Sequence, residues 1–337
     1  MGMARGARRR KRKKLRLGRL LFVVLCACAV LWGAALLVSA AVRQFRAVGT
    51  EIGPLPRVLQ AETPPPTVLT DEISSRNALL MRRRDGRVFC EKQPDAQAYP
   101  ASLTKMMTAL VALEQIEDLT RTVEVPAEIF DALYREGASV AGFLPGERAR
   151  AIDLVYGVLL PSGADAAQTL AMDIAGSEEA FVSLMNERAA GLGMTGTHFA
   201  NVSGLTDADH YTTARDMAKL ADAALDNAAF REIFTAKKWV VAPINAHPDG
   251  FTMTSTLFSN MESTELADGA ILGGKTGYTG AAGLCLASVA EIEGEEYILV
   301  TLGAAGTYGD HPMHFADART IYQNYAGSAR RSGGSAA

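Results

Sequence analysis

Apolar and polar positions alternate in short runs from residue 77 onward, and turn signals separate the runs. Asn77–Met81 and Arg87–Cys90 predict two strands around Asp85-Gly86, a dipeptide typical of tight hairpins. A helix is predicted next, because apolar residues recur at helical spacing from Leu103 to Leu113. This order of strand, strand and helix indicates a domain that mixes a sheet with helices.

The middle of the chain is mainly helical, and strands return near its end. Residues 151–175 predict two helical pieces that are interrupted at Pro161-Ser162-Gly163. Two amphipathic helices, three consecutive strands and a closing helix are predicted over Ser177–Leu192, Thr213–Leu225, Gly273–Tyr278, Gly283–Glu291, Glu296–Gly303 and Met313–Tyr325.

A different pattern precedes the folded region. Residues 20–42 are uncharged and apolar over a length that can cross a bilayer, and basic residues are concentrated on their N-terminal side. A cleaved signal peptide is the alternative, because Ser39-Ala40-Ala41 are small, but the apolar run is longer than the usual core of about 7–15 residues. We therefore expect an uncleaved, single-pass anchor in the cell membrane, with the folded domain outside the cytoplasm.

The sequence divides into five segments. The stretch after the anchor contains Pro54, Pro56 and Pro64-Pro65-Pro66, which favours an extended spacer. The predicted order is a basic cytoplasmic segment at 1–19, the transmembrane anchor or signal segment at 20–42, a Pro-containing spacer at 43–72, a folded domain at 73–326 and a disordered tail at 327–337.

Composition and charge narrow the range of functions. The chain has 337 residues, of which 48% are hydrophobic, so it can bury a sizeable core. Its net charge of −3 is unevenly distributed. The first 50 residues contain twelve basic and no acidic residues, and the remaining residues contain 22 basic and 37 acidic ones. That acidic balance argues against nucleic-acid binding by the folded part. Cys90 and Cys285 lie in apolar, strand-like sequence, which predicts buried free thiols.

The first motif with chemical potential is Ser102-Leu103-Thr104-Lys105, an S-x-x-K tetrad at the start of a predicted helix. A spacing of three residues places the hydroxyl and the ammonium on one helical face. Serine needs an adjacent base to become a good nucleophile, and lysine can be that base once burial or another cation lowers its pKa. The N–H groups at a helix start can also stabilise an oxyanion. Serine is a common helix cap, however, so the tetrad alone also fits a structural role.

Two further motifs place polar side chains at breaks or on glycine-flanked backbone. Ser162-Gly163-Ala164-Asp165 separates two helical segments, where a hydroxyl can relay a proton or cap a helix. Gly273-Gly274-Lys275-Thr276-Gly277 places a cation and a hydroxyl on a strand whose glycines permit close approach of a substrate backbone or mark a bulge.

In their order and spacing, the three motifs resemble those of the D-alanyl-D-alanine carboxypeptidases, the low-molecular-mass, serine-type penicillin-binding proteins. The resemblance covers about residues 77 to 325 and includes PASLTKMMTALVALE from residue 100, GVLLPSGADAA from 157, GMTGTHFANVSGL from 193, HYTTARDMAKLA from 210 and GGKTGYTGAAGLCL from 273. It implies an α+β, β-lactamase/transpeptidase-like domain with a mostly antiparallel sheet flanked by helices and a helical subdomain, here preceded by one transmembrane helix.

The resemblance also implies a reaction. Ser102 would attack the carbonyl between the two terminal D-alanines of a peptidoglycan stem peptide while Lys105 takes its proton, and Ser162 would pass a proton to the leaving amine. Water would then hydrolyse the acyl-enzyme. Stem peptides are the implied substrate, β-lactams the implied covalent inhibitors and the cytoplasmic membrane a partner through the N-terminal helix, with no cofactor or metal.

Substrate binding is assigned by the same resemblance to the third motif. Lys275 and Thr276 would bind the terminal carboxylate of the stem peptide, next to Gly277. The backbone N–H groups of Ser102 and Tyr278 would hold the oxyanion.

One position departs from the family pattern. The middle motif of the family usually reads Ser-x-Asn, whereas its third residue here is Ala164. A methyl group cannot donate or accept the hydrogen bonds of an asparagine, so turnover is in doubt. Asp165 is next to it, but adjacent residues on a helix do not share a face, so we expect Asp165 to point elsewhere.

Three alternatives stay open. A penicillin-binding sensor that is acylated but hardly turns over would agree with Ala164. A β-lactamase is less favoured, because its Glu-x-x-Leu-Asn signature is absent and Val182 occupies the glutamate position. A metal-dependent peptidase would depend on His311 and His314, which lack a partner motif. His198 and His210 are expected to be structural.

Overall fold

The computed structural model describes residues 65–307, 309 and 312–327. The predicted anchor at 20–42 and the last residues of the predicted tail lie outside these ranges. Within them, no helix combines the length and the apolar character needed to cross a membrane.

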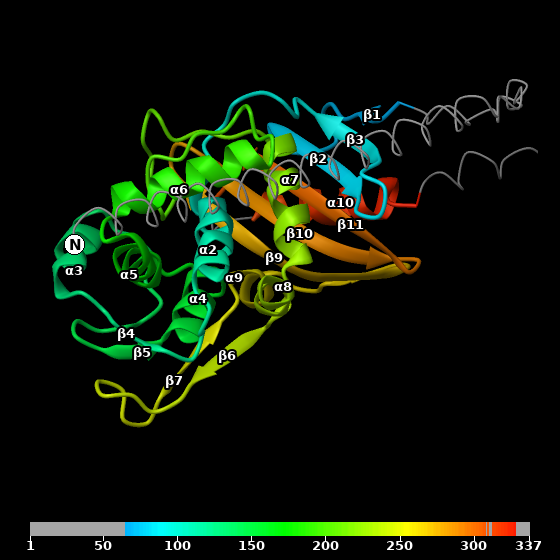
Figure 1. The fold of residues 1–337 in the computed structure, drawn as a ribbon. Helices are drawn as coiled ribbons and strands as arrows, with labels where there is room; N and C mark the ends of the chain where they lie inside the picture. Colours follow the sequence, from blue (N-terminus) through cyan, green and yellow to red (C-terminus); the bar gives the residue numbers. More distant parts are fainter. Residues whose placement is uncertain (1–64, 308, 310–311, 328–337) are drawn as a thin grey trace, which may run out of the picture. The chain divides into compact units, whose positions relative to one another are not determined.

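A seven-stranded sheet forms the centre of the described domain (Figure 1). Its strands pair antiparallel except for the parallel pair of β1 and β3. In spatial order they are β1 (Thr67–Val68), β3 (Val88–Lys92), β2 (Asn77–Arg82), β11 (Glu295–Ala304), β10 (Gly283–Ile292), β9 (Gly269–Thr279) and β8 (Glu265–Leu266).

The predicted hairpin around Asp85-Gly86 and the consecutive strands predicted over Gly283–Glu291 and Glu296–Gly303 are confirmed. Gly86, between β2 and β3, has a φ of 66°, which the Asp-Gly turn signal anticipates. Glu293 and Gly294, between β10 and β11, have φ values of 54° and 77°, as a two-residue turn with two left-handed positions requires.

Eleven helical segments are present among the described residues, and most lie on one side of the sheet (Figure 1). The predicted helices are confirmed within a few residues, including the interruption between α4 and α5. The segments are η1 (Ala101–Leu103), α2 (Thr104–Gln115), η2 (Ala127–Ile129), α3 (Phe130–Arg135), α4 (Ala151–Leu159), α5 (Ala164–Ala175), α6 (Glu178–Gly191), α7 (Ala214–Asp226), α8 (Ala228–Thr235), α9 (Thr256–Asn260) and α10 (Met313–Tyr325).

Polar residues define several of the helix ends. The Ser177 side chain accepts the Ala180 N–H at the start of α6, and the Thr213 side chain accepts the Asp216 N–H at the start of α7. Gly176, with a φ of 78°, ends α5 in the left-handed conformation that glycine adopts at little cost. Local sequence therefore accounts for where these helices begin and end.

The two faces of the sheet bury separate hydrophobic clusters. Leu79 and Leu80 are adjacent on β2, yet Leu79 packs into the larger cluster with the helical side, and Leu80 packs into the smaller cluster with α10. The same alternation separates Ile298 from Leu299 on β11. Strand periodicity thus directs one set of side chains toward the helices that carry the site and the other toward α10.

Two small two-stranded sheets were not predicted. Antiparallel pairs join β4 (Thr122–Glu124) to β5 (Arg148–Arg150) and β6 (Lys238–Val241) to β7 (Phe251–Thr254). Asn245, in the loop between β6 and β7, accepts the Arg148 N–H at 2.8 Å, so the two sheets are in contact. Three or four residues are too few for a clear alternation of apolar and polar positions.

The domain begins before the predicted boundary at residue 73. Thr67 and Val68 form β1 beside β3, and the side chains of Leu69 and Ile73 are buried in the cluster around α10. Residues 65–72 are therefore part of the folded domain, and the prediction of a spacer over 43–72 is wrong for this end. This two-residue strand was not predicted because it lies in a proline-rich stretch.

Candidate active site

Ser102 lies in η1, the single helical turn that leads into α2. The Lys105 ammonium is 3.2 Å from the Ser102 Oγ, so the expected shared helical face brings the two groups into contact. Ala101, directly before the serine, has a φ of 48°, which is uncommon for a residue with a side chain. A strained backbone at this position is typical of functional sites.

Lys105 is held almost out of contact with solvent. Its side chain is 2% exposed, and its Nζ also donates to the Ser203 carbonyl at 2.8 Å. Burial lowers the pKa of Lys105 to about 7, against a smaller opposing effect from the Asp165 carboxylate. A large share of this lysine is thus neutral near pH 7 and able to accept the serine proton.

Ser162 and Lys275 meet although 113 residues separate them in the sequence. The Lys275 Nζ donates to the Ser162 Oγ at 2.9 Å and to the Thr276 carbonyl at 2.7 Å. Ser162, between α4 and α5, has a φ of 68°, a second left-handed position on a residue with a side chain. Burial lowers the pKa of Lys275, and the nearby charge of Lys105 lowers it further.

The strand β9 brings the third motif against the nucleophile. A Cβ added at Gly277 would lie 3.0 Å from the Ser102 nitrogen and 3.1 Å from the Ala101 Cβ, so a side chain there would push the strand away from η1. Thr276 shares a hydrogen bond of 2.7 Å with the Thr256 hydroxyl at the start of α9. The glycine is therefore required by the close approach of β9 to Ser102.

A pocket of about 670 Å³ opens over the nucleophile. Its lining includes Ser102, Lys105 and Tyr278. The other predicted site residues do not line the pocket and are connected to it through contacts with one another and with Ser102, namely Ser162, Lys275, Thr276 and Gly277. Acidic residues from three other segments also line the pocket, namely Glu136, Glu178 and Asp207. The pocket thus combines a serine, a buried amine and an acidic wall.

Asp165 does not point at the nucleophile. Its carboxylate accepts the backbone N–H groups of Ala141, Gly142 and Phe143 at 2.7, 3.2 and 3.1 Å. The expectation that Asp165 faces elsewhere is thus confirmed. Ala164 is fully buried, and its N–H donates to the Ser139 carbonyl at 2.7 Å. The two residues together hold the loop that contributes Ser139 to the pocket wall.

His210 supports the site without lining its pocket. The Nδ1 of His210 accepts the Ala200 N–H at 3.0 Å, so its Nε2 carries the proton and donates to the Thr104 hydroxyl at 2.7 Å. Thr104 in turn donates to the Ala101 carbonyl at 2.8 Å. Burial lowers the pKa of His210 to about 4, so it stays neutral at ordinary pH. The expected structural role is confirmed for His210.

The backbone carbonyl of Ser203, which holds Lys105, was not predicted from the sequence. The Asn201 Oδ1 accepts the N–H groups of Ser203 and Gly204 at 3.2 and 2.7 Å, a turn that directs the Ser203 carbonyl at the lysine. The signal was present as Asn-x-Ser-Gly, which is typical of an asparagine-capped turn. Its relevance to Lys105 depends on a contact between residues 98 positions apart.

The histidine pair that suggested a metal is only partly within the described residues. His311 lies outside them, and His314 is buried in α10 against the Phe315 ring, with burial lowering its pKa to about 4. No group of three or more His, Cys, Asp and Glu side chains placed to hold a metal occurs among the residues that the structure describes. Cys90 and Cys285 are buried free thiols, as predicted.

Comparison with known proteins agrees with this geometry. The family model of D-alanyl-D-alanine carboxypeptidases, peptidase S11, matches residues 60–306. A D-alanyl-D-alanine carboxypeptidase of Bacillus subtilis is 32% identical over 249 residues, and one of Escherichia coli is 39% identical over 165 residues. These matches cover 68% and 47% of this chain but only 58% and 41% of the relatives.

A solved structure matches a larger share of its own chain. The crystal structure of the Streptomyces K15 DD-transpeptidase has a TM-score of 0.67 and 27% sequence identity, and the match covers 75% of this chain and 97% of that one. The mixed arrangement of sheet and helices described above is therefore a transpeptidase-like α+β fold.

Proposed function

Because this chain belongs to the D-alanyl-D-alanine carboxypeptidase family, we propose that it removes the terminal D-alanine from peptidoglycan stem peptides through an acyl-enzyme on Ser102. The observation that supports this most directly is the buried Lys105 amine, 3.2 Å from the Ser102 Oγ and with a pKa lowered to about 7. A serine next to a neutral amine in an accessible pocket is an activated nucleophile.

The proposed first step is acylation. Neutral Lys105 takes the hydroxyl proton of Ser102 while its Oγ attacks the carbonyl carbon of the penultimate D-alanine. The bond between that carbon and the nitrogen of the terminal D-alanine breaks, and the proton held by Lys105 passes to this nitrogen through the hydroxyl of Ser162, which is bonded to Lys275, so that Lys105 is neutral again. The backbone N–H groups of Ser102 and Tyr278 stabilise the oxyanion in this scheme. Water then hydrolyses the serine ester and restores the hydroxyl.

Binding of the substrate is assigned to the third motif. Thr276 and Lys275 receive the terminal carboxylate, and the acidic residues that line the pocket suit a cationic side chain earlier in the stem. β-Lactams present a similar carboxylate beside a reactive carbonyl, so they would acylate the same serine.

The test uses the full-length chain in detergent, as wild type and as Ser102→Ala. We expect covalent labelling by a fluorescent penicillin and release of D-alanine from diacetyl-Lys-D-Ala-D-Ala in the wild type, and neither in the variant. Absence of both signals from folded wild-type protein would rule out Ser102 as the nucleophile.

Ala164 supports a second candidate, a sensor that is acylated but hardly turns over. Labelling of the wild type without release of D-alanine would favour the sensor. The next comparison would then be Ala164→Asn, because an asparagine there would restore a donor and an acceptor to the middle motif.

We further propose that residues 20–42 anchor the enzyme in the cell membrane with the domain outside the cytoplasm. The uncharged stretch and the basic residues before it support this arrangement. The full-length chain should stay with the membrane fraction after alkaline carbonate washing and keep its N-terminal segment by mass spectrometry. A chain that begins near residue 42 would instead indicate a cleaved signal peptide.

A further inference from the structure

A second pocket of about 390 Å³ lies next to the catalytic pocket. The walls of the two pockets continue into one another at two places: Asp207 and Gly280 line the catalytic pocket, and the next residues, Ala208 and Ala281, line the second one. The family-like motifs leave this second pocket without a role. Its position makes it an extension of the substrate cleft.

The direction of the substrate decides which part of it reaches the second pocket. In the proposed function, the terminal carboxylate lies at Lys275 and Thr276, and the scissile carbonyl lies at the Tyr278 N–H. An extended substrate advances about 3.3 Å per residue along a strand, so its earlier residues continue past Gly280 toward Ala281. The second pocket is therefore on the side of the stem peptide that leads back to the glycan.

Arg76 gives this pocket its charge. The side chain is exposed, and its Nη2 donates to the Ala282 carbonyl at 3.2 Å. No carboxylate of the described residues lies within ion-pair distance of Arg76, in contrast to Arg83 and Arg215, which contact three and two carboxylates. A guanidinium with this much donor capacity is suited to bind a carboxylate of a ligand.

The position of Arg76 is restricted by its neighbours. A Cβ added at Gly303 would lie 2.6 Å from the Arg76 Nε, so the glycine leaves the space that the guanidinium occupies at the end of β11. The Arg76 N–H also donates to the Leu302 carbonyl at 3.0 Å. The side chain therefore needs little reorganisation to receive an anion.

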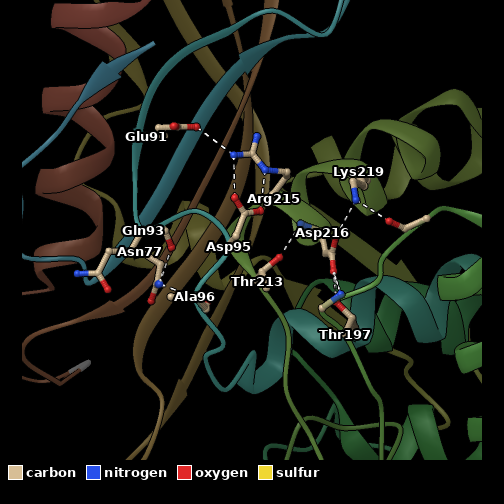
Figure 2. A network of polar contacts seen from close by, with 12 residues as sticks. Asn77, Glu91, Gln93, Asp95, Ala96, Thr197, Thr213, Arg215, Asp216 and Lys219 are labelled. Carbon is tan, nitrogen blue, oxygen red and sulfur yellow. Dashed lines mark hydrogen bonds and ion pairs between the residues drawn. The ribbon is translucent and has the colours of Figure 1, made fainter. Parts of the chain in front are cut away.

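Polar contacts also hold another part of the pocket lining in place, and Figure 2 shows this network. The Asn77 amide donates to the carbonyls of Gln93 and Ala96 at 2.9 and 3.4 Å, and Arg215 binds Asp95 from the other side at 2.7 Å. These contacts fix the loop that supplies Gln93, Ala96 and Gln97 to the pocket. Half-buried Tyr99 and Tyr211 also line it.

We propose that the second pocket binds the second residue of the stem peptide, which is acidic. The free α-carboxylate of that residue would pair with the Arg76 guanidinium. This residue keeps an α-carboxylate because the stem continues through its side-chain carboxyl group. The amides and tyrosines of the pocket suit the polar backbone around it. The inference depends on the proposed function for the direction of the substrate.

The experiment compares kcat/KM for L-Ala-γ-D-Glu-L-Lys-D-Ala-D-Ala with that for diacetyl-Lys-D-Ala-D-Ala, which ends before the second pocket. In Arg76→Met full-length protein, the ratio of the two values should fall about tenfold, the loss of a charge-assisted bidentate pair. The matched control is Arg148→Met, whose side chain is 68% exposed and lines neither pocket, and whose ratio should equal that of the wild type. A pentapeptide in which the α-carboxylate of the D-Glu residue is amidated should show the same tenfold decrease in the kcat/KM ratio with the wild-type enzyme.

A ratio unchanged by Arg76→Met, or an amidated pentapeptide hydrolysed as well as the acidic one, would overturn the proposal. Calorimetry keeps the two hypotheses distinguishable. The pentapeptide should bind Ser102→Ala about tenfold more tightly than it binds Ser102→Ala/Arg76→Met, whether or not the wild type turns over. Equal affinities would exclude the carboxylate site, while a wild type that hydrolyses neither substrate would overturn the proposed function alone.

Discussion

Polar groups are buried on both faces of the sheet, but the two faces satisfy them differently. On the α10 face, the Asp317 carboxylate accepts the N–H groups of Ser74 and Ser75 at 2.9 and 2.7 Å and the Ser75 hydroxyl at 2.6 Å. The hydroxyls of Ser288 and Tyr322 are 3.0 Å apart on the same face. Every one of these groups has partners that suit its charge or polarity.

The helical face buries two lysine amines instead. Lys105 and Lys275 are 2% and 0% exposed, and their Nζ atoms contact hydroxyl and carbonyl oxygens. Burial disfavours the charged form of each lysine, and the nearby charge of Lys105 further disfavours that of Lys275. The comparison shows that one face uses buried polar groups for stability, and the other keeps an unfavourable arrangement that lowers the pKa of a base.

The largest expected effect comes from removal of the buried base. In Lys105→Met, the rate of Ser102 acylation by penicillin should fall about a thousandfold, because the proton acceptor is lost. The free energy of unfolding should not fall and is expected to rise by about 1 kcal/mol, since a buried amine is replaced by an apolar side chain. Stopped-flow labelling and urea unfolding measure the two quantities.

Lys238→Met is the matched control, because that lysine is exposed on β6. It should change neither the labelling rate nor the unfolding free energy appreciably. Labelling of Lys105→Met at the wild-type rate would mean that another group is the base.

On the α10 face, we expect a substitution to lower the stability of the protein and to leave its activity unchanged. Asp317→Ala removes three hydrogen bonds and leaves the buried Ser75 hydroxyl and N–H without their acceptor. The free energy of unfolding should fall by about 3 kcal/mol, while kcat of the folded fraction stays at the wild-type value. A loss of activity that exceeds the loss of folded protein would contradict the separation of the two faces.

A smaller effect is expected from pH. The neutral form of Lys105 is the base, and its pKa is lowered to about 7, so protonation below that pH removes activity. The acylation rate should therefore be about tenfold lower at pH 6 than at pH 8. A rate independent of pH across this range would show that the lysine does not titrate there.

The smallest predicted effect is that of Tyr322→Phe. Loss of its hydroxyl removes a hydrogen bond to the Ser288 carbonyl at 3.1 Å and the contact with the Ser288 hydroxyl. We expect the free energy of unfolding to decrease by about 1 kcal/mol, with no change in the penicillin labelling rate. Thermal unfolding monitored by circular dichroism, beside the labelling assay, measures both.

Helices and long strands were predictable because their information is local. Caps such as Thr213, the Asp85-Gly86 turn and apolar spacing act within a few residues. The two-stranded sheets β4–β5 and β6–β7 and the strand β1 were not predicted, because each depends on contacts between segments rather than on its own pattern.

Some features of the active site likewise follow from the local sequence, and others depend on tertiary contacts. The sequence specifies that Ser102 and Lys105 share a helical face, because a separation of three residues in a helix makes them neighbours in any fold. Three features arise only after the chain has packed. They are the contact of Lys275 with Ser162, the hydrogen bond from Lys105 to the Ser203 carbonyl, and the burial that lowers the pKa of Lys105. Desolvation depends on all the atoms that surround a group, and these come from segments far apart in the chain.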